Sequence, residues 1–194
     1  MNPAGPWVPV ASAVLFGAGT PLAKALLGGV SPWVLAGLLY LGSGLGLGVY
    51  RLIARTPRVH LDASARLPLF GAVLFGGVVG PVLLMAGLVR LPASGASLLL
   101  NAEAVFTVVL AWAVFGEHLG RRIVLGMAAI VAGAVVLSVP AGVELGGVWP
   151  SLAVLGACLC WAVDNNLTRK VAVADATWLA AVKGLVAGPV NLAL

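Results

Sequence analysis

The chain has 194 residues, of which 61% are hydrophobic and only 9% are charged, and its mean hydropathy is +1.12. Soluble domains have roughly 45–50% apolar and about 25% charged residues, so this composition excludes an ordinary soluble domain. The net charge of +5 does not indicate a nucleic-acid-binding protein, because the basic residues cluster at the ends of apolar runs. We therefore expect an integral membrane protein.

Seven apolar runs can be cut between glycines, prolines and charges, and a membrane-spanning helix needs about 20 mainly apolar residues. In chain order the predicted spans are Trp7–Leu27, Pro32–Leu52, Leu67–Leu91, Ser94–Phe115, Ile123–Val139, Val148–Asn166 and Trp178–Leu194. Their backbone groups must bond within the segment, and no barrel-like alternation is present, so all should be helices. The predicted fold is all-α, a polytopic membrane helix bundle. The first run is expected to be an uncleaved span, because residues 1–6 contain no Lys or Arg.

The basic residues are distributed unevenly between the loops. Eight follow even-numbered spans: Arg51, Arg55, Arg58, Arg66, Arg121, Arg122, Arg169 and Lys170. Only Lys24 and Arg90 follow odd-numbered spans, and Lys183 lies within the seventh. Because cytoplasmic loops carry the excess of Lys and Arg, the N-terminus and the even-numbered loops are expected in the cytoplasm. The location is expected to be the cell (inner or plasma) membrane.

The sequence also indicates an internal repeat. A shift of 145 positions aligns the last two spans with the first two, with Trp33 on Trp178 and Ala36 on Ala181. Five spans is an odd number, so a second copy would begin on the opposite side of the membrane, as in the inverted repeats of secondary transporters. We expect a first five-helix repeat over residues 1–140 and the start of an inverted repeat over residues 141–194. Since the chain ends within an apolar run, we expect about three further spans of that repeat to be missing.

The segment ASLLLNAEAVFTVVLAWAVFGEHLGRRIVLGMAAIVAGAVVLSV, Ala96 to Val139, resembles the end of an EamA domain of the drug/metabolite transporter superfamily. The shared features are a fourth span bearing Asn and Glu, the pair Gly116 and Glu117 at its end, and a Gly/Ala-rich fifth span. CLCWAVDNNLTRKV, from Cys158, is similar to the opening helix of the family's second domain. The resemblance implies ten helices in two inverted repeats around a central cavity, and transport or export of a small molecule. Members handle amino acids, other metabolites, nucleotide-linked sugars or drugs, so the substrate does not carry over.

Glu103 places a carboxylate about ten residues from each end of the fourth span. A charge at that depth costs roughly 2.5–3.5 kcal/mol, so such groups almost always face protein or a water-filled cavity. Thr107 lies one turn further along the same face, while Ser94, Ser97 and Asn101 form a second polar stripe. We expect Glu103, Asn101 and Thr107 to line a cavity, where Glu103 would bind a cationic or amine-bearing solute or take up a proton. The alternative is a carboxyl that merely joins two helices.

A second polar group lies near the inner end of the sixth span, where Asp164, Asn165 and Asn166 are consecutive. Three successive residues cover most of a helix circumference, so at least one should face protein or a cavity. Lys183 lies equally far from the connecting loop in the seventh span, so we expect it to pair with Asp164, as a structural salt bridge or as a substrate clamp. Trp161 could stack on a substrate, with a core or lipid-facing role as the alternative.

Three further patterns bear on helix shape and packing. Pro21 and Pro81 each remove a backbone donor, so both should bend their helices. Overlapping GxxxG spacings predict a close-packing helix face formed by Gly42, Gly44, Gly46 and Gly48. Glu117 and Arg121, four residues apart, could form a local ion pair, although the geometry differs if the helix ends at Gly116. The alternative is a solvated helix end.

These observations favour a secondary carrier or exporter that moves a small metabolite or drug-like solute by alternating access between two inverted repeats. The alternatives are a non-transporting membrane component that packs with partner helices, and an intramembrane enzyme, for which the sequence contains no catalytic constellation. No enzymatic activity, cofactor or metal site is expected, because the two histidines lack zinc-site spacing and no phosphate-loop motif is present. The expected partners are a small-molecule solute and the lipid bilayer, not nucleic acid. Proton coupling and homo-oligomer formation are left open.

Overall fold

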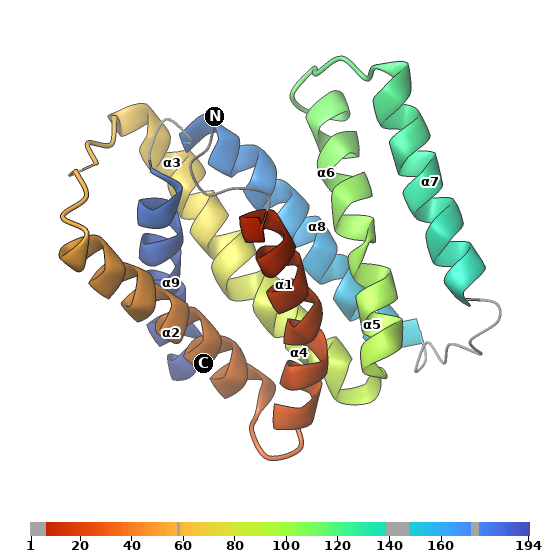
Figure 1. The fold of residues 1–194 in the computed structure, drawn as a ribbon, viewed down its shortest axis with the longest axis horizontal. Coiled ribbons are helices and arrows are strands. Elements are labelled where there is room, and N and C mark those ends of the chain that lie inside the picture. Colours follow the sequence, from red (N-terminus) through yellow and green to blue (C-terminus); the bar gives the residue numbers. More distant parts are fainter. Residues whose placement is uncertain (1–6, 58, 139–147, 172–174) are drawn as a thin grey trace.

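The computed structural model describes residues 7–57, 59–138, 148–171 and 175–194, and its regular elements in these ranges are all helices (Figure 1). Five spans are continuous helices: α1 (Trp7–Leu26), α2 (Pro32–Ile53), α7 (Arg121–Ser138), α8 (Val148–Val171) and α9 (Ala176–Ala193). The third span joins α3 (Ala63–Ala72), η1 (Val73–Val79) and α4 (Gly80–Arg90), and the fourth joins α5 (Ala93–Leu100) and α6 (Ala102–Ala113). The all-α bundle with seven spans is thus confirmed, with helix ends a few residues from those predicted.

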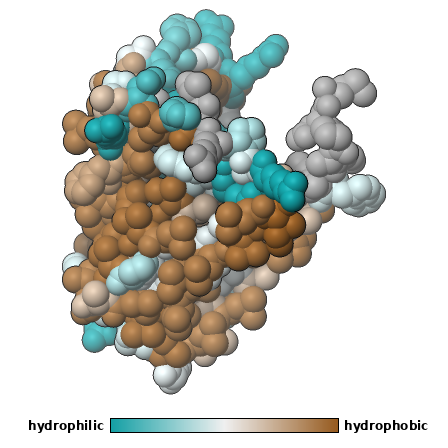
Figure 2. All heavy atoms as spheres, turned by 90° about the vertical axis from the view of Figure 1, so that its left-hand side faces the viewer, coloured by the Kyte–Doolittle hydropathy of each residue, from teal (hydrophilic) through white to brown (hydrophobic). Residues whose placement is uncertain are grey.

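Several of these helices have the length and composition of membrane spans. Among the described residues, five qualify: Pro32–Ile53, Ala63–Arg90, Ala93–Ala113, Val148–Arg169 and Ala176–Ala193, with Val10–Leu26 as a shorter apolar helix. Figure 2 shows a broad hydrophobic face below a hydrophilic upper end. Large apolar side chains such as Leu15, Leu52 and Leu125 are exposed on the bundle. In water such a surface would be costly, whereas lipid chains cover it without that cost.

Helix α8 lies at the centre of the described bundle, where it packs against α3, η1, α4, α5 and α6. The hydrophobic core fills the space between α4 and α8, and its fully buried members include Leu88, Val154, Ala157 and Cys158. In contrast, α7 contacts only α5 and α6 extensively and lies at one side of the bundle (Figure 1). The site described below therefore forms around α8 and its neighbours.

Helices α2 and α9 approach each other to backbone contact. A Cβ added at Gly44 would lie 2.5 Å from the backbone nitrogen of Leu185, and one added at Gly184 would lie 2.5 Å from the Cα of Gly44. The predicted glycine face is therefore correct for Gly44 but wrong for Gly42, Gly46 and Gly48, where an added Cβ would meet nothing within 4 Å. Successive helical residues turn by about 100°, so Gly42 and Gly46, each two residues from Gly44, point away from α9. Gly48 is one turn from Gly44 on the same face, but it lines an open pocket between α2 and α9 instead of a contact.

The third span is irregular where Pro81 was expected to bend it. Its middle part, η1, is a π-helix, in which the N–H of Gly80 bonds to the carbonyl of Phe75. In that register the donor for the Gly76 carbonyl would be residue 81, and proline has no N–H. The Gly76 carbonyl is consequently available to side chains from other helices. By contrast, α1 continues as a helix through Pro21.

Candidate functional site

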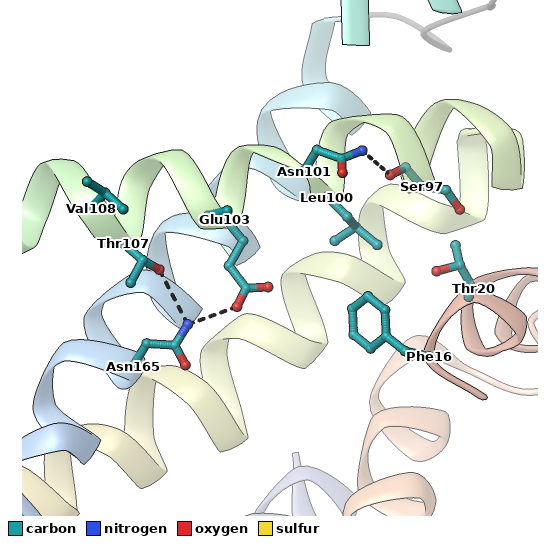
Figure 3. A pocket seen from close by; sticks show the side chains of 11 residues that line it. Phe16, Thr20, Ser97, Leu100, Asn101, Glu103, Thr107, Val108 and Asn165 are labelled. Carbon is teal, nitrogen blue, oxygen red and sulfur yellow. Dashed lines mark hydrogen bonds between the residues drawn. The ribbon is translucent and has the colours of Figure 1, made fainter. Parts of the chain in front are cut away.

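A polar cleft of about 640 Å³ lies between α1, the α5–α6 span and α8 (Figure 3). A volume of this size suits a small-molecule ligand. Its wall is mostly apolar, with Phe16, Leu100 and Val108 among the lining residues. The polar residues that line it are Thr20, Ser97, Asn101, Glu103, Thr107 and Asn165. The cleft thus combines an apolar wall with a small set of hydrogen-bonding groups.

Glu103 is the centre of the polar set. The side-chain amide nitrogen of Asn165, on α8, donates to Glu103 Oε1 at 2.9 Å and to Thr107 Oγ1 at 3.3 Å. Figure 3 shows the second carboxyl oxygen of Glu103 pointing away from Asn165, toward the side of the cleft where Leu100 and Phe16 lie. Because Glu103 and Thr107 share one face of α6, a single amide on α8 reaches both. Among the described residues, one hydrogen bond orients the carboxylate, and its second oxygen is left for a further donor.

Asn101 lies at the junction of α5 and α6. Its amide nitrogen donates to the carbonyl oxygens of Ser97 at 3.2 Å and Leu98 at 3.1 Å. A side chain that bonds to the carbonyls of its own helix competes with the regular helical bonds, and here the helix is interrupted at this residue. Asn101 therefore shapes the cleft wall as well as lining it.

Asn166 is buried behind the cleft and joins α8 to α6. Its amide nitrogen donates to the carbonyl of Thr107 at 3.0 Å and to that of Ala162 at 2.8 Å, while its oxygen accepts from Arg169 at 3.2 Å. All its polar atoms are therefore engaged with protein groups. This is the arrangement expected for a polar side chain that fastens two helices.

The predicted ion pair between Asp164 and Lys183 is present and buried beside the π-helix. Lys183 donates to Asp164 Oδ2, and Thr168 donates to Oδ1 at 2.9 Å. The carboxylate lies directly against Gly76, where an added Cβ would be 2.0 Å from Asp164 Oδ2. Only glycine leaves room for the charged group at this point, so the pair is built into the contact between α8, α9 and the third span.

Trp161 and Tyr40 bind the carbonyl that the π-helix leaves available. Trp161 Nε1 donates to the Gly76 carbonyl at 3.1 Å, and the Tyr40 hydroxyl donates to the same oxygen at 2.5 Å. Nearby, the buried Asn191 of α9 donates to the Gly77 carbonyl at 2.9 Å. Side chains from three helices thus compensate for the irregular backbone, as required in a hydrocarbon environment.

The eight sequence-predicted site residues therefore separate into two groups. Glu103, Asn101, Thr107 and Asn165 line the cleft, whereas Asp164, Asn166, Lys183 and Trp161 bind protein groups next to it. Sequence reasoning missed three residues: Thr20 and Phe16, which line the cleft from α1, and Tyr40, which holds the π-helix. The polar side chain of Thr20 within the first apolar run was the one feature of the sequence that could have indicated a cleft residue on α1. No feature of the neighbouring sequence indicated that Tyr40 bonds to the π-helix.

Two ion pairs connect the first five spans to α8 and α9 at the end where the basic residues gather. Arg51 of α2 donates to Asp175 at 2.5 Å and to Thr177 at 2.7 Å, and Asp175 also caps α9 by accepting from the Thr177 N–H at 2.8 Å. The hydrogen bonds from Thr177 and Arg51 hold the pKa of the Asp175 carboxyl well below its usual range. The second pair joins Glu117 to Arg169.

Of the two arrangements left open for Glu117, the structure has neither a local pair with Arg121 nor a carboxylate without a protein partner, because Glu117 bonds to Arg169 of α8 through both carboxylate oxygens. The cause is Gly116, whose φ of +67° turns the chain at the end of α6, while the Glu117 N–H reaches back to the Ala111 carbonyl at 3.0 Å. A positive φ favours glycine at that position, because glycine has no Cβ. The hydrogen bonds from Arg169 lower the pKa of Glu117.

Among the residues described, no group of three or more His, Cys, Asp or Glu side chains is placed to hold a metal ion. The polar cleft, by comparison, contains a single carboxylate with amide and hydroxyl neighbours. The groups that these side chains offer are hydrogen-bond donors and acceptors and one carboxylate.

Comparison with known proteins agrees with this architecture. An uncharacterized transporter from Methanothermobacter thermautotrophicus is 27% identical over 206 aligned positions, covering 94% of this chain and 58% of that protein, so the chain spans little more than half the length of this relative. A solved crystal structure, titled only as that of a protein, has a similar fold with a TM-score of 0.60 and 21% identity, covering 93% of this chain and 65% of that one. The EamA-like transporter family matches residues 4–139. The chain is therefore a multi-pass membrane protein that belongs to the EamA-like transporter family.

Proposed function

We propose that this protein acts in a secondary carrier or exporter that moves a small metabolite or drug-like solute, and that the solute binds in the cleft around Glu103. The observation that carries the proposal is that Glu103 and Thr107 of α6 are joined to Asn165 of α8 across the wall of one cleft. A polar cavity at mid-membrane depth, between two helical units, is where secondary transporters bind their substrates.

We also infer that residues 1–140 form one repeat and residues 141–194 begin a second, inverted one. The start of one pair of helices supports this division, because α2 begins at Pro32 and α9 at Ala176, 144 residues later. This spacing is close to the shift of 145 positions seen in the sequence. Alternating access would then be a rocking of the two repeats around the cleft.

In the proposed orientation the N-terminus and the ends bearing Arg51 and Arg169 lie in the cytoplasm, following the excess of basic residues there. The membrane is the cell membrane. Both ion pairs between the first five spans and the last two described helices, Arg51 with Asp175 and Glu117 with Arg169, lie at this end. In the described conformation these pairs hold the units together on the cytoplasmic side, and alternating access would have to break them.

The test is solute flux in sealed vesicles that contain the full-length protein, with labelled amino acids, nucleotide-linked sugars and drug-like amines as candidate solutes. The variant Glu103→Gln keeps the size of the side chain and removes its charge, so flux should fall at least about tenfold. Asp62→Asn, at an exposed carboxylate that precedes α3 and makes no cap bond, is the matched control and should leave flux unchanged. Absence of flux for every solute would instead favour a non-transporting component that packs with partner helices. Equal flux in wild type and Glu103→Gln would remove the cleft assignment.

A further inference from the structure

The charge of the cleft restricts the solutes that can occupy it. Glu103 is the one charged residue among the described residues that line it, and no described basic side chain forms an ion pair with it. One carboxylate oxygen, Oε1, accepts from Asn165 at 2.9 Å. An amide N–H orients a carboxylate but does not neutralise it, so the negative charge is left for a ligand to compensate.

Three described basic side chains, on α1, α8 and α9, have partners other than Glu103. Lys183 pairs with Asp164, and Arg169 pairs with Glu117. Lys24, on the same helix as the cleft residue Thr20, donates to the carbonyl oxygens of Leu88 at 2.6 Å and Val89 at 2.9 Å. Recruiting any of them to Glu103 would leave a carboxylate or a set of helix-end carbonyls without its partner. The free-energy cost of that exchange opposes neutralisation of Glu103 by a basic side chain of the protein itself.

The rest of the cleft has features that suit an organic cation. The hydroxyls of Thr20, Ser97 and Thr107 are acceptors for N–H groups. The Phe16 ring, 68% exposed, lines the cleft on the side that the second Glu103 oxygen faces (Figure 3). An aromatic face attracts a cation and also packs against an apolar body. A ligand that places an ammonium group at Glu103 and an apolar group against Phe16 and Leu100 would use both halves of the site.

We propose that the cleft selects a monovalent organic ammonium ion, a primary or secondary amine with an apolar or aromatic body, through the uncompensated carboxylate of Glu103. This inference rests on the proposed function, because it names the class of solute that the carrier would take. Anionic solutes are excluded by the same carboxylate, since like charges at short distance in a site of low polarity repel strongly. Neutral analogues lose the charge interaction but keep the apolar contacts.

Three probes of similar size and with the same phenyl ring separate these cases: phenethylammonium, 2-phenylethanol and 3-phenylpropionate. Their binding is measured by calorimetry on the full-length protein in lipid nanodiscs. Phenethylammonium should bind at least about tenfold more tightly than the alcohol, and the carboxylate should bind most weakly. In Glu103→Gln the preference for the amine over the alcohol should disappear, while Glu103→Asp should retain part of it. Asp62→Asn, whose carboxylate is exposed and outside the cleft, should bind all three like the wild type.

Equal binding of the amine and the alcohol, a preference for the carboxylate, or no binding of phenethylammonium up to its solubility limit would overturn the inference. So would an amine preference that survives in Glu103→Gln. The result is separable from that of the flux experiment, because Glu103-dependent amine binding without flux would refute transport and leave the ligand class standing. Flux of neutral or anionic solutes without any preference for amines would support transport and refute the proposed ligand class.

Discussion

Single residues decide whether charged groups can be tolerated at hydrocarbon depth in this bundle. Asp164 is buried, and its two carboxylate oxygens accept hydrogen bonds from Lys183 and Thr168. The carboxylate fits there because Gly76 has no side chain. Glu103, only half-buried, has an amide donor and no ion pair among the described residues. The difference in partners, rather than in residue type, separates the structural carboxylate from the proposed ligand-binding one.

Gly76→Ala should be strongly destabilising. The added methyl group would lie 2.0 Å from Asp164 Oδ2 and 2.3 Å from its Cγ, and the carboxylate cannot withdraw without leaving Lys183. Overpacking of this kind costs about 1–3 kcal/mol, which thermal unfolding in detergent would detect as a lower midpoint. Gly46→Ala is the matched control, since an added Cβ there meets nothing within 4 Å. Equal midpoints for the two variants would contradict this account of the contact.

Asp175 provides a test of pH dependence, because Thr177 and Arg51 hold its pKa below the ordinary value of 3.8. A depressed pKa in the folded state means that the stabilisation is present above the unfolded-state value and is lost as the pH falls through the folded-state value. Asp175→Asn keeps a helix-capping side chain but removes the charge. The variant should unfold at a lower temperature than wild type at pH 7. The difference should begin to shrink once the pH falls below the unfolded-state pKa of 3.8 and should continue to shrink toward the lower folded-state pKa. A difference that stays constant as the pH falls below 3.8 would exclude the ion pair as its cause.

At the scale of elements, the irregular third span is the feature on which the packing of α2, α8 and α9 depends. The Gly76 carbonyl accepts hydrogen bonds from Tyr40 of α2 and Trp161 of α8. The Gly77 carbonyl accepts one from Asn191 of α9. In a regular α-helix the Gly80 N–H would bond to the Gly76 carbonyl, whereas the donor to the Gly77 carbonyl would be Pro81, which has no N–H. Carbonyl groups of the third span instead bond to side chains of other helices.

This interpretation predicts energetic coupling between Tyr40 and Pro81. Tyr40→Phe removes one donor to the Gly76 carbonyl and should cost about 1 kcal/mol. Pro81→Ala restores an N–H that can reach the same carbonyl, so Tyr40→Phe should cost clearly less in the Pro81→Ala background. Thermal unfolding of the four proteins in one double-mutant cycle measures the coupling. Identical costs in both backgrounds would show that the missing donor at residue 81 is not what makes Tyr40 important.

Features that depend on local sequence could be predicted, and those that depend on contacts between distant helices could not. Apolar length sufficed for the seven spans, and the equal distance of Asp164 and Lys183 from one loop sufficed for their pair. Pro81 indicated a bend but not a π-helix.

Contacts between distant helices could not be predicted. They include the partners of Gly76 and the pairing of Glu117 with Arg169 instead of Arg121. These contacts depend on which helices become neighbours, and the periodicity of one helix carries no such information. The same limit explains the glycine face, since the pattern placed four glycines in one contact and only Gly44 meets α9.

For the whole molecule, the proposed rocking motion requires that the contacts between the two proposed repeats be unequal at the two ends. Arg51 with Asp175 and Glu117 with Arg169 join the first five spans to α8 and α9 at the basic end, while the cleft lies deeper, around Glu103. The Glu117–Arg169 pair is about half exposed, and exposed pairs contribute little to stability. Such weak interactions are suited to bias a conformational equilibrium without trapping one state.

Weakening these pairs should therefore open the basic end more often. In a background with Cys158→Ala and Cys160→Ala, a single Ala104→Cys in the cleft is labelled with a membrane-impermeant maleimide applied from the basic side. Adding Arg169→Ala or Asp175→Asn should raise the labelling rate by up to about fivefold, a modest factor because exposed ion pairs contribute little. Arg121→Ala, at the same end but without an ion pair among the described residues, should have no effect. The charge-reversed double variant Glu117→Arg with Arg169→Glu should return the rate toward that of the starting protein. Unchanged labelling in both single variants would mean that these pairs do not control access, and that contacts elsewhere between the repeats set the equilibrium.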